Sequence, residues 1–210
     1  RRSVRQVSKA ALLGTAFNLS RWGARRIISP RITVLLYHRV SDSARDNLTV
    51  GVEQFDRQMA LIARHCRVLP LEEVLAVQAI GRSDRPLVAI TFDDGYLDNC
   101  EHAVPILLRH GLPAAFFVST GMIGGDGRFP HDDARGNSRI PTMSWRHLRS
   151  RREAGFSIGS HTVSHIDCAA EPENVVWDEL VRSRDVLQQE LGVSQPVFAY
   201  PYGGRKNMTH

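Results

Sequence analysis

Two adjacent carboxylates and two spaced histidines are the side chains of this sequence best suited to chemistry. Asp93 and Asp94 stand side by side and repel each other unless a cation or a proton intervenes. Because Gly95 follows, a plain Asp-Gly turn explains this pair equally well when it is taken alone. His161 and His165 are four residues apart, which puts two imidazoles on one face of a helical turn, where they can share a metal. Each pair is weak evidence alone, and together they predict a metal site.

The chemistry predicted for such a site is hydrolysis. Two imidazoles and one carboxylate form a standard open site for catalytic zinc, because three protein ligands leave room for water and substrate. One aspartate would bind the metal, and the other would act as a general base toward the metal-activated water. No glutamate follows His161, so the pattern differs from the His-Glu-x-x-His helix of zinc proteases.

The elements that must position these residues alternate along the chain. Continuous apolar runs predict strands, and helical spacing separates them, which favours an α/β fold with a parallel sheet or barrel. The predicted strands cover residues 32–37, 87–92, 114–118, 156–158 and 197–200, and the predicted helices cover 52–66, 71–77, 101–110, 144–154 and 174–191. Functional residues gather at the carboxyl ends of such strands, where both pairs stand. Residues 121–142 have no period and predict a long surface loop.

The composition is that of an ordinary globular domain. The chain has 210 residues, of which 42% are hydrophobic and 23% charged. No apolar run approaches the roughly 18 residues that a membrane-spanning helix needs. The three cysteines are odd in number and widely spaced, so we expect neither a disulfide framework nor a thiolate metal site.

The net positive charge of the chain comes from its amino-terminal part. Residues 1–41 contain nine of the 27 Lys and Arg residues and no acid, which leaves 18 basic against 22 acidic side chains elsewhere. A nucleic-acid binder would spread basic residues over a folded face, so we expect no nucleic-acid partner. Residues 1–31 form a basic amphipathic segment that either contacts an anionic membrane surface or packs on the domain of residues 32–210. This segment contains no clear signal peptide.

Three motifs resemble those of one enzyme family. Residues 91–95 (TFDDG), 160–165 (SHTVSH) and 200–203 (YPYG) are similar, in order and spacing, to the first three motifs of the polysaccharide deacetylase family. This family is also called the NodB-homology domain or carbohydrate esterase family 4, and the resemblance covers about residues 32–205. It implies a distorted (β/α) barrel that uses zinc or another divalent metal to remove acetyl groups, usually from N-acetylglucosamine (GlcNAc) units.

The resemblance also assigns roles to single residues. It makes Asp93 the base, and the metal ligands Asp94, His161 and His165. The backbone N–H of Tyr202 would stabilise the oxyanion of the tetrahedral intermediate, as such donors do in acyl transfer. Pro201 and Tyr202 would line the substrate site.

Two departures from the family pattern concern the remaining roles. Ala199 stands where the family often has an arginine that orients the base, and the usual Leu-x-x-His motif does not follow Tyr202. Residues 35–38 (LLYH) fit Leu-x-x-His instead and resemble a branch with permuted motifs, which contains deacetylases of poly-N-acetylglucosamine. His38 would then be the general acid, or would merely line the pocket. Arg39 would contact substrate or be solvated.

Two aromatic residues could offer surfaces for a sugar ring. Trp145 would stack on substrate or pack its helix onto the barrel. Phe129 would stack on substrate or anchor the long loop.

The predicted function is a metal-dependent deacetylase that hydrolyses the N-acetyl group of a GlcNAc-containing glycan, located in the bacterial cell envelope or at a membrane. Two alternatives stay open. One is a catalytically weak or inactive glycan-binding remnant, since we expect the barrel to be truncated after residue 210. The other is a hydrolase of the same fold that acts on a different acetyl ester or amide.

Overall fold

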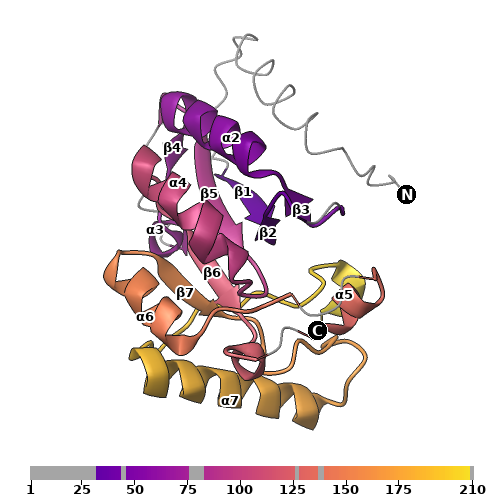
Figure 1. The fold of residues 1–210 in the computed structure, drawn as a ribbon. Coiled ribbons are helices and arrows are strands. Elements are labelled where there is room, and N and C mark those ends of the chain that lie inside the picture. The colour runs from indigo at the N-terminus through magenta and orange to yellow at the C-terminus, as the bar shows by residue number, and fades with distance from the viewer. Residues whose placement is uncertain (1–31, 44–45, 76–82, 126–127, 137–139, 209–210) are drawn as a thin grey trace, which may run out of the picture.

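A parallel sheet flanked by helices forms the centre of the molecule (Figure 1). The computed structural model describes residues 32–43, 46–75, 83–125, 128–136 and 140–208. The basic segment of residues 1–31 lies outside these described residues, so the predicted division at residue 31 stays a prediction. In the described part of the chain, no helix has both the length and the apolar character needed to cross a bilayer.

The sheet has the order β1-β5-β6-β7, and its pairings are all parallel. These strands are β1 (Ile32–Tyr37), β5 (Leu87–Phe92), β6 (Ala115–Val118) and β7 (Ser157–Ser160). The short strand β4 (Arg67–Val68) pairs with the start of β5, and β2 (Arg39–Val40) pairs with β3 (Thr49–Val50) in a separate small sheet. Among the described residues β1 pairs with β5 alone, so these strands form an open sheet.

The predicted strand at residues 197–200 is wrong in extent. A single bridge joins Ser160 to Phe198 there. The predicted strands at 32–37 and 87–92 have the bounds that the structure gives them, and those at 114–118 and 156–158 are shifted by one or two residues.

Helices cover the sheet and lie beyond its β7 edge (Figure 1). The longer ones are α2 (Val52–His65), α4 (Val104–His110), α6 (Trp145–Glu153) and α7 (Glu173–Leu191), and shorter ones are α3 (Leu71–Leu75) and α5 (Pro130–Asp133). A π-helix η3 (Asn99–Ala103) leads into α4, and two 3-10 turns are η4 (Thr120–Met122) and η5 (Arg205–Asn207). All the predicted helices are present, although the first residues predicted for α4 belong to η3.

Local sequence signals explain where two helices begin and end. Ser144 caps α6 by accepting a hydrogen bond from the backbone of His147, whose side chain accepts from the Ser144 backbone in return. Gly111 ends α4 in the left-handed conformation (φ +64°), which glycine adopts without steric cost.

A row of aromatic rings runs across the sheet and fixes the strand ends. Tyr37, Phe92 and Phe116 stand opposite one another in the strand register, with ring centroids 5.5 and 4.9 Å apart. Phe156 continues the row, 5.6 Å from Phe116, and Phe55 of α2 closes over Tyr37. These buried rings lie at or next to the carboxyl ends of β1 and β5, so the residues that follow are held by a rigid core.

Close packing between β6 and β7 depends on a glycine. A Cβ atom at Gly159 would lie 2.6 Å from the Phe117 ring and 2.7 Å from the Val197 carbonyl oxygen. No side chain fits there. The backbone of β7 can therefore pack directly against the backbone at Val197, just before the second motif.

The long loop contains a helix that the sequence did not predict. Residues 130–133 form α5, whereas the whole of 121–142 was predicted to be irregular. Four residues are too few to produce a periodic pattern.

The three cysteines are free, as expected.

Candidate metal centre

The two aspartates follow β5 directly and leave it through a tight turn. Asp94 and Gly95 both have positive φ, +72° and +76°. A non-glycine residue in this region costs roughly 1–3 kcal/mol and is found mainly where the surroundings impose it. Both aspartate side chains are buried, and the backbone N–H of Asp93 donates to the Tyr37 carbonyl of β1.

The two histidines converge in a different way from that predicted. Residues 161–165 are not helical but form a loop after β7, in which Thr162 (φ +66°) and His165 (φ +59°) are left-handed. The Thr162 hydroxyl accepts a hydrogen bond from the His165 backbone, and the Ser119 hydroxyl donates to the His161 carbonyl. The helical-turn geometry was therefore wrong, although both imidazoles face the Asp94 carboxylate.

One carboxylate of α7 holds this loop from behind. Glu179 accepts hydrogen bonds from the backbone N–H groups of Val163 and Ser164 at 2.8 and 2.9 Å, and from the Ser164 hydroxyl at 2.7 Å. Charged acceptors make the stronger hydrogen bonds in proteins. The loop between the two motif histidines is thus tied to α7.

The Asp94 carboxylate faces the Nε2 atoms of both histidines. Its Oδ1 atom is 3.6 Å from His161 Nε2 and 3.1 Å from His165 Nε2. Both Asp94 oxygens are buried and make no hydrogen bond of ordinary geometry. Burial acts to raise the pKa of Asp94, but the contacts with His131 and His165 outweigh it, so this pKa lies well below its usual value. A buried carboxylate in this state needs a cation.

The hydrogen bond of His161 shows which of its ring nitrogens can bind a metal ion. Its Nδ1 atom is 2.8 Å from the Ala199 carbonyl oxygen, which can only accept, so Nδ1 carries a proton. Burial lowers the pKa of His161 to about 4, so the ring is neutral near pH 7 and Nε2 presents a lone pair. A lone pair aimed at a carboxylate is repulsive unless a metal ion lies between them, and a carbonyl that fixes the ring is typical of metal-binding histidines.

The distances fit a tetrahedral ion. Metal–ligand bonds of about 2.0–2.2 Å place neighbouring tetrahedral ligand atoms roughly 3.3–3.5 Å apart. The distances from Asp94 to the two motif histidines, 3.1 and 3.6 Å, bracket that value. The residues present therefore fit a divalent cation such as zinc.

Asp93 has the properties of a proton acceptor. Burial, and then the neighbouring Asp94 carboxylate, raise the pKa of Asp93 well above its ordinary value. Its Oδ1 atom is buried and has no hydrogen-bonding partner. A carboxylate whose pKa is raised toward neutrality is a better match for proton transfer near pH 7.

His38 lies beside this pair in the sheet. Because Tyr37 pairs with Phe92, His38 and Asp93 leave their strands at the same level. Asn99, in the π-helix η3, donates a hydrogen bond of 2.9 Å to the His38 carbonyl oxygen. Single π-helical turns recur at functional sites, and here the turn fixes the backbone of a candidate general acid.

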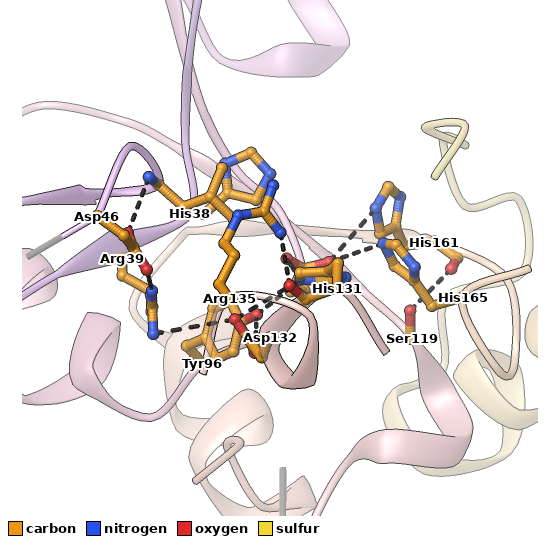
Figure 2. Close-up of polar contacts among 12 residues, drawn as sticks. His38, Arg39, Asp46, Tyr96, Ser119, His131, Asp132, Arg135, His161 and His165 are labelled. Carbon is orange, nitrogen blue, oxygen red and sulfur yellow. Dashed lines mark hydrogen bonds and ion pairs between the residues drawn. The ribbon is translucent and has the colours of Figure 1, made fainter. Parts of the chain in front are cut away.

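Arg39 lies in the interior, not on a substrate-facing surface. Its side chain is 1% exposed and pairs with Asp46, and its guanidinium lies 5.4 Å from the Tyr96 ring and 4.0 Å from Asp132. Neither the predicted substrate contact nor the solvated alternative agrees with this burial. Arg39 lies between Asp46 and Asp132, next to Tyr96 (Figure 2).

The third motif supplies an exposed side chain at the edge of the candidate metal centre. Pro201 is buried, whereas Tyr202 is 50% exposed and its ring lies 4.9 Å from that of His165. Tyr202 has positive φ (+65°) within the turn that Gly203 closes onto Tyr200. The Tyr202 ring therefore stands next to the candidate metal centre, and Pro201 precedes it in the same turn.

Sequence reasoning missed His131 of α5, which also faces Asp94, at 3.4 Å from Oδ2. The signal available was a histidine followed by two aspartates in an otherwise irregular loop. Of the two candidate stacking residues, Phe129 is fully buried against the rings of His131 and His165, and Trp145 packs on the core. Both therefore have the packing roles that were the alternatives.

The candidate metal centre lies at the carboxyl ends of a parallel sheet in an α/β fold, and comparison with known proteins identifies the family. Residues 81–210 match the family described as polysaccharide deacetylase, and the chain belongs to that family. The chain is 26% identical over 178 residues to a poly-beta-1,6-N-acetyl-D-glucosamine N-deacetylase of Staphylococcus aureus, a match that covers 80% of the chain and 58% of the relative.

Two solved structures share the fold. The Streptococcus pyogenes deacetylase PplD in complex with acetate has a TM-score of 0.68 at 25% identity, covering 84% of this chain and 76% of that one. IcaB from Ammonifex degensii has a TM-score of 0.67 at 26% identity, covering 84% and 77%. The predicted α/β fold of the NodB-homology type is confirmed by these similarities.

Proposed function

We propose that the chain acts as a metal-dependent de-N-acetylase on a glycan that contains GlcNAc. The observation that carries this proposal is the buried Asp94 carboxylate, which lacks a hydrogen-bonding partner and faces the Nε2 atoms of His161 and His165. A divalent cation bound there, zinc in this proposal, supplies a Lewis acid that polarises the acetyl carbonyl and lowers the pKa of water.

The side chains around that position would divide the remaining work. Asp94, His161 and His165 would hold the cation, and three protein ligands are the number usual at catalytic zinc sites. Asp93 removes a proton from the attacking water, in agreement with its raised pKa and its unpartnered Oδ1 atom. His38, level with Asp93 in the sheet, delivers a proton to the leaving amine nitrogen.

The third motif would bind the reacting carbonyl. The backbone N–H of Tyr202 donates to the oxyanion that develops on the acetyl group, and Pro201 fixes the turn that aims this donor. The exposed Tyr202 ring, next to His165, offers an edge against which a sugar can lie. Arg39 is proposed as a support for the site because its side chain is buried.

The relatives support the choice of substrate. One is named for removing N-acetyl groups from poly-beta-1,6-N-acetyl-D-glucosamine, and that name favours an envelope polysaccharide, and hence the bacterial cell envelope, for this chain. The chain spans 58% of that relative's length, so the polymer and the location are proposals drawn from a partial match.

Acetate release tests the function. The metal-depleted chain is assayed on soluble β-1,6-linked GlcNAc oligomers and on chitin oligomers, with and without added zinc. We expect zinc-dependent release that Asp93→Asn lowers by about 10²- to 10⁴-fold while zinc affinity stays within a few-fold. His161→Ala should lose zinc.

The control is Asp84→Asn, an exposed aspartate before the amino end of β5, which should leave both measurements unchanged. Zinc binding without acetate release from any oligomer would favour the glycan-binding alternative. Release from O-acetylated sugars alone would favour the acetyl-ester alternative.

A further inference from the structure

A histidine from outside the three motifs enters the candidate metal centre on α5. His131 Nε2 lies 3.4 Å from Asp94 Oδ2, whereas His161 and His165 face the other oxygen, Oδ1. Asp94, His131 and His165 have potential ligand atoms that all lie within 4.8 Å of one another. His131 is therefore either a further ligand or a group that orients the Asp94 carboxylate.

The hydroxyl group of Tyr96 distinguishes these two roles. It lies 2.6 Å from Asp132 Oδ2 and 2.9 Å from His131 Nε2. A hydroxyl has one proton and an ionised carboxylate can only accept, so the proton is donated to Asp132. The Tyr96 oxygen then accepts from His131, whose Nε2 atom must carry a proton. A protonated ring nitrogen has no lone pair for a metal.

The contrast with His161 supports the same assignment. His161 uses Nδ1–H to donate to a carbonyl oxygen, which leaves its Nε2 lone pair directed at the Oδ1 side of Asp94. A fourth protein ligand would also fill the position that a catalytic site keeps open. The arrangement suits a carboxylate that binds the metal through one oxygen and is held by a donor at the other.

We propose that His131 is a positioning residue. Its Nε2–H donates to the Tyr96 oxygen and at the same time faces Asp94 Oδ2 at 3.4 Å, so that the positive end of this N–H holds Oδ2 while Oδ1 faces the metal together with His161 and His165. This inference rests on the proposed function, because it needs a metal at Asp94. It assigns a role in the metal centre to the loop helix α5, which belongs to none of the three motifs.

A buried cluster keeps His131 in place (Figure 2). The ring stacks on Phe129, with centroids 5.2 Å apart and planes 30° apart. Asp132, one residue further on, is fixed by Tyr96 and lies 4.0 Å from the Arg39 guanidinium. The buried arginine therefore acts on the metal centre through α5 without touching it.

Zinc affinity, measured by competition with a chromophoric chelator, tests the proposal. In His131→Ala we expect zinc to bind about 10- to 100-fold more weakly, the usual effect of losing a group that orients a ligand. In His131→Gln the amide N–H can replace Nε2–H, so affinity should stay within a few-fold of wild type. The control His110→Gln, on the far end of α4, should have no effect.

Cobalt substitution tests the same proposal in the absence of turnover. The visible absorption of bound Co²⁺ reports the number and type of ligands, and we expect the same spectrum for wild type and both His131 variants. An altered spectrum would make His131 a ligand and overturn the proposal. Unchanged zinc affinity in His131→Ala, or equal losses in the Ala and Gln variants, would overturn it as well.

Three further outcomes can be told apart. If His131→Ala fails to fold, His131→Gln carries the test, and a loss of tenfold or more in its zinc affinity contradicts the proposal. If the wild-type chain binds no zinc, the metal centre and this inference fail together. If it binds zinc but releases no acetate, the proposed function fails while the role of His131 stands.

Discussion

At the scale of the residue, burial decides what the acidic side chains can do. Three carboxylates close to one another in sequence follow β5, and each has a different environment. Asp94 is faced by imidazoles, Asp93 is buried beside a like charge, and Asp98 has a buried oxygen without a partner. The same residue type therefore serves as candidate ligand, candidate base and structural liability.

Asp98 predicts a pH dependence of stability. Burial, the largest cause, raises its pKa to about 7 in the folded chain, so the folded state binds this proton more tightly than the unfolded state. Stability is then lost as pH rises between about 4 and 7, by up to about 4 kcal/mol. Asp98→Asn should lack this loss.

The measurement is chemical denaturation of both proteins at several pH values. The difference in unfolding free energy, variant minus wild type, should grow with pH across that window. A difference that stays constant would show that Asp98 does not titrate there.

At the scale of the element, α7 supports the loop that carries the two motif histidines. Glu179 holds the backbone of Val163 and Ser164, two residues between His161 and His165. This support explains how Thr162, a β-branched residue, is kept at positive φ.

Replacing this carboxylate should loosen the loop. We expect Glu179→Ala to lower the unfolding free energy by about 2 kcal/mol, because backbone N–H donors lose a charged acceptor. Zinc affinity should fall as well. Asp178→Asn is the matched control, since that residue is adjacent on α7 and makes only an exposed ion pair with Arg182. Equal effects of the two changes would contradict the proposed support.

The sequence predicted the elements better than the geometry of the centre. The two strands at 32–37 and 87–92 are continuous apolar runs, and this local signal was sufficient. The path from His161 to His165 was mispredicted because spacing suggested a helix, whereas a contact with Glu179, 15 and 16 residues away, sets a left-handed backbone. His131 was missed because its place in the centre depends on tertiary contacts with Tyr96 and Phe129, which no local pattern encodes.

At the scale of the whole molecule, charge and exposed apolar side chains are unevenly distributed. The basic excess lies in the first 41 residues, whereas the rest of the chain is slightly acidic. The sheet is asymmetric too, because β1 pairs with β5 alone among the described residues and leaves Val34 and Leu36 about half exposed. The chain thus has a basic end that could bind an anionic surface and an apolar strand at one edge.

The basic segment of residues 1–31 predicts binding to anionic membranes. We expect the chain to co-sediment with vesicles containing phosphatidylglycerol, but not with neutral ones, and to dissociate as salt is raised, since each basic residue near such a surface contributes about 1 kcal/mol. A chain beginning at residue 32 is the control and should not bind. Equal binding of both chains would favour packing of the segment on the domain.

The left-handed residues of the three motifs have a consequence for protein engineering. Asp94, Thr162, His165 and Tyr202 are the non-glycine residues with positive φ in the described part of the chain, and all four stand in the motifs. A redesign guided by stability alone would replace them with glycine, because glycine relieves this strain. Such a variant could gain thermal tolerance at the expense of turnover, so these positions must be held constant when the remaining surface is optimised.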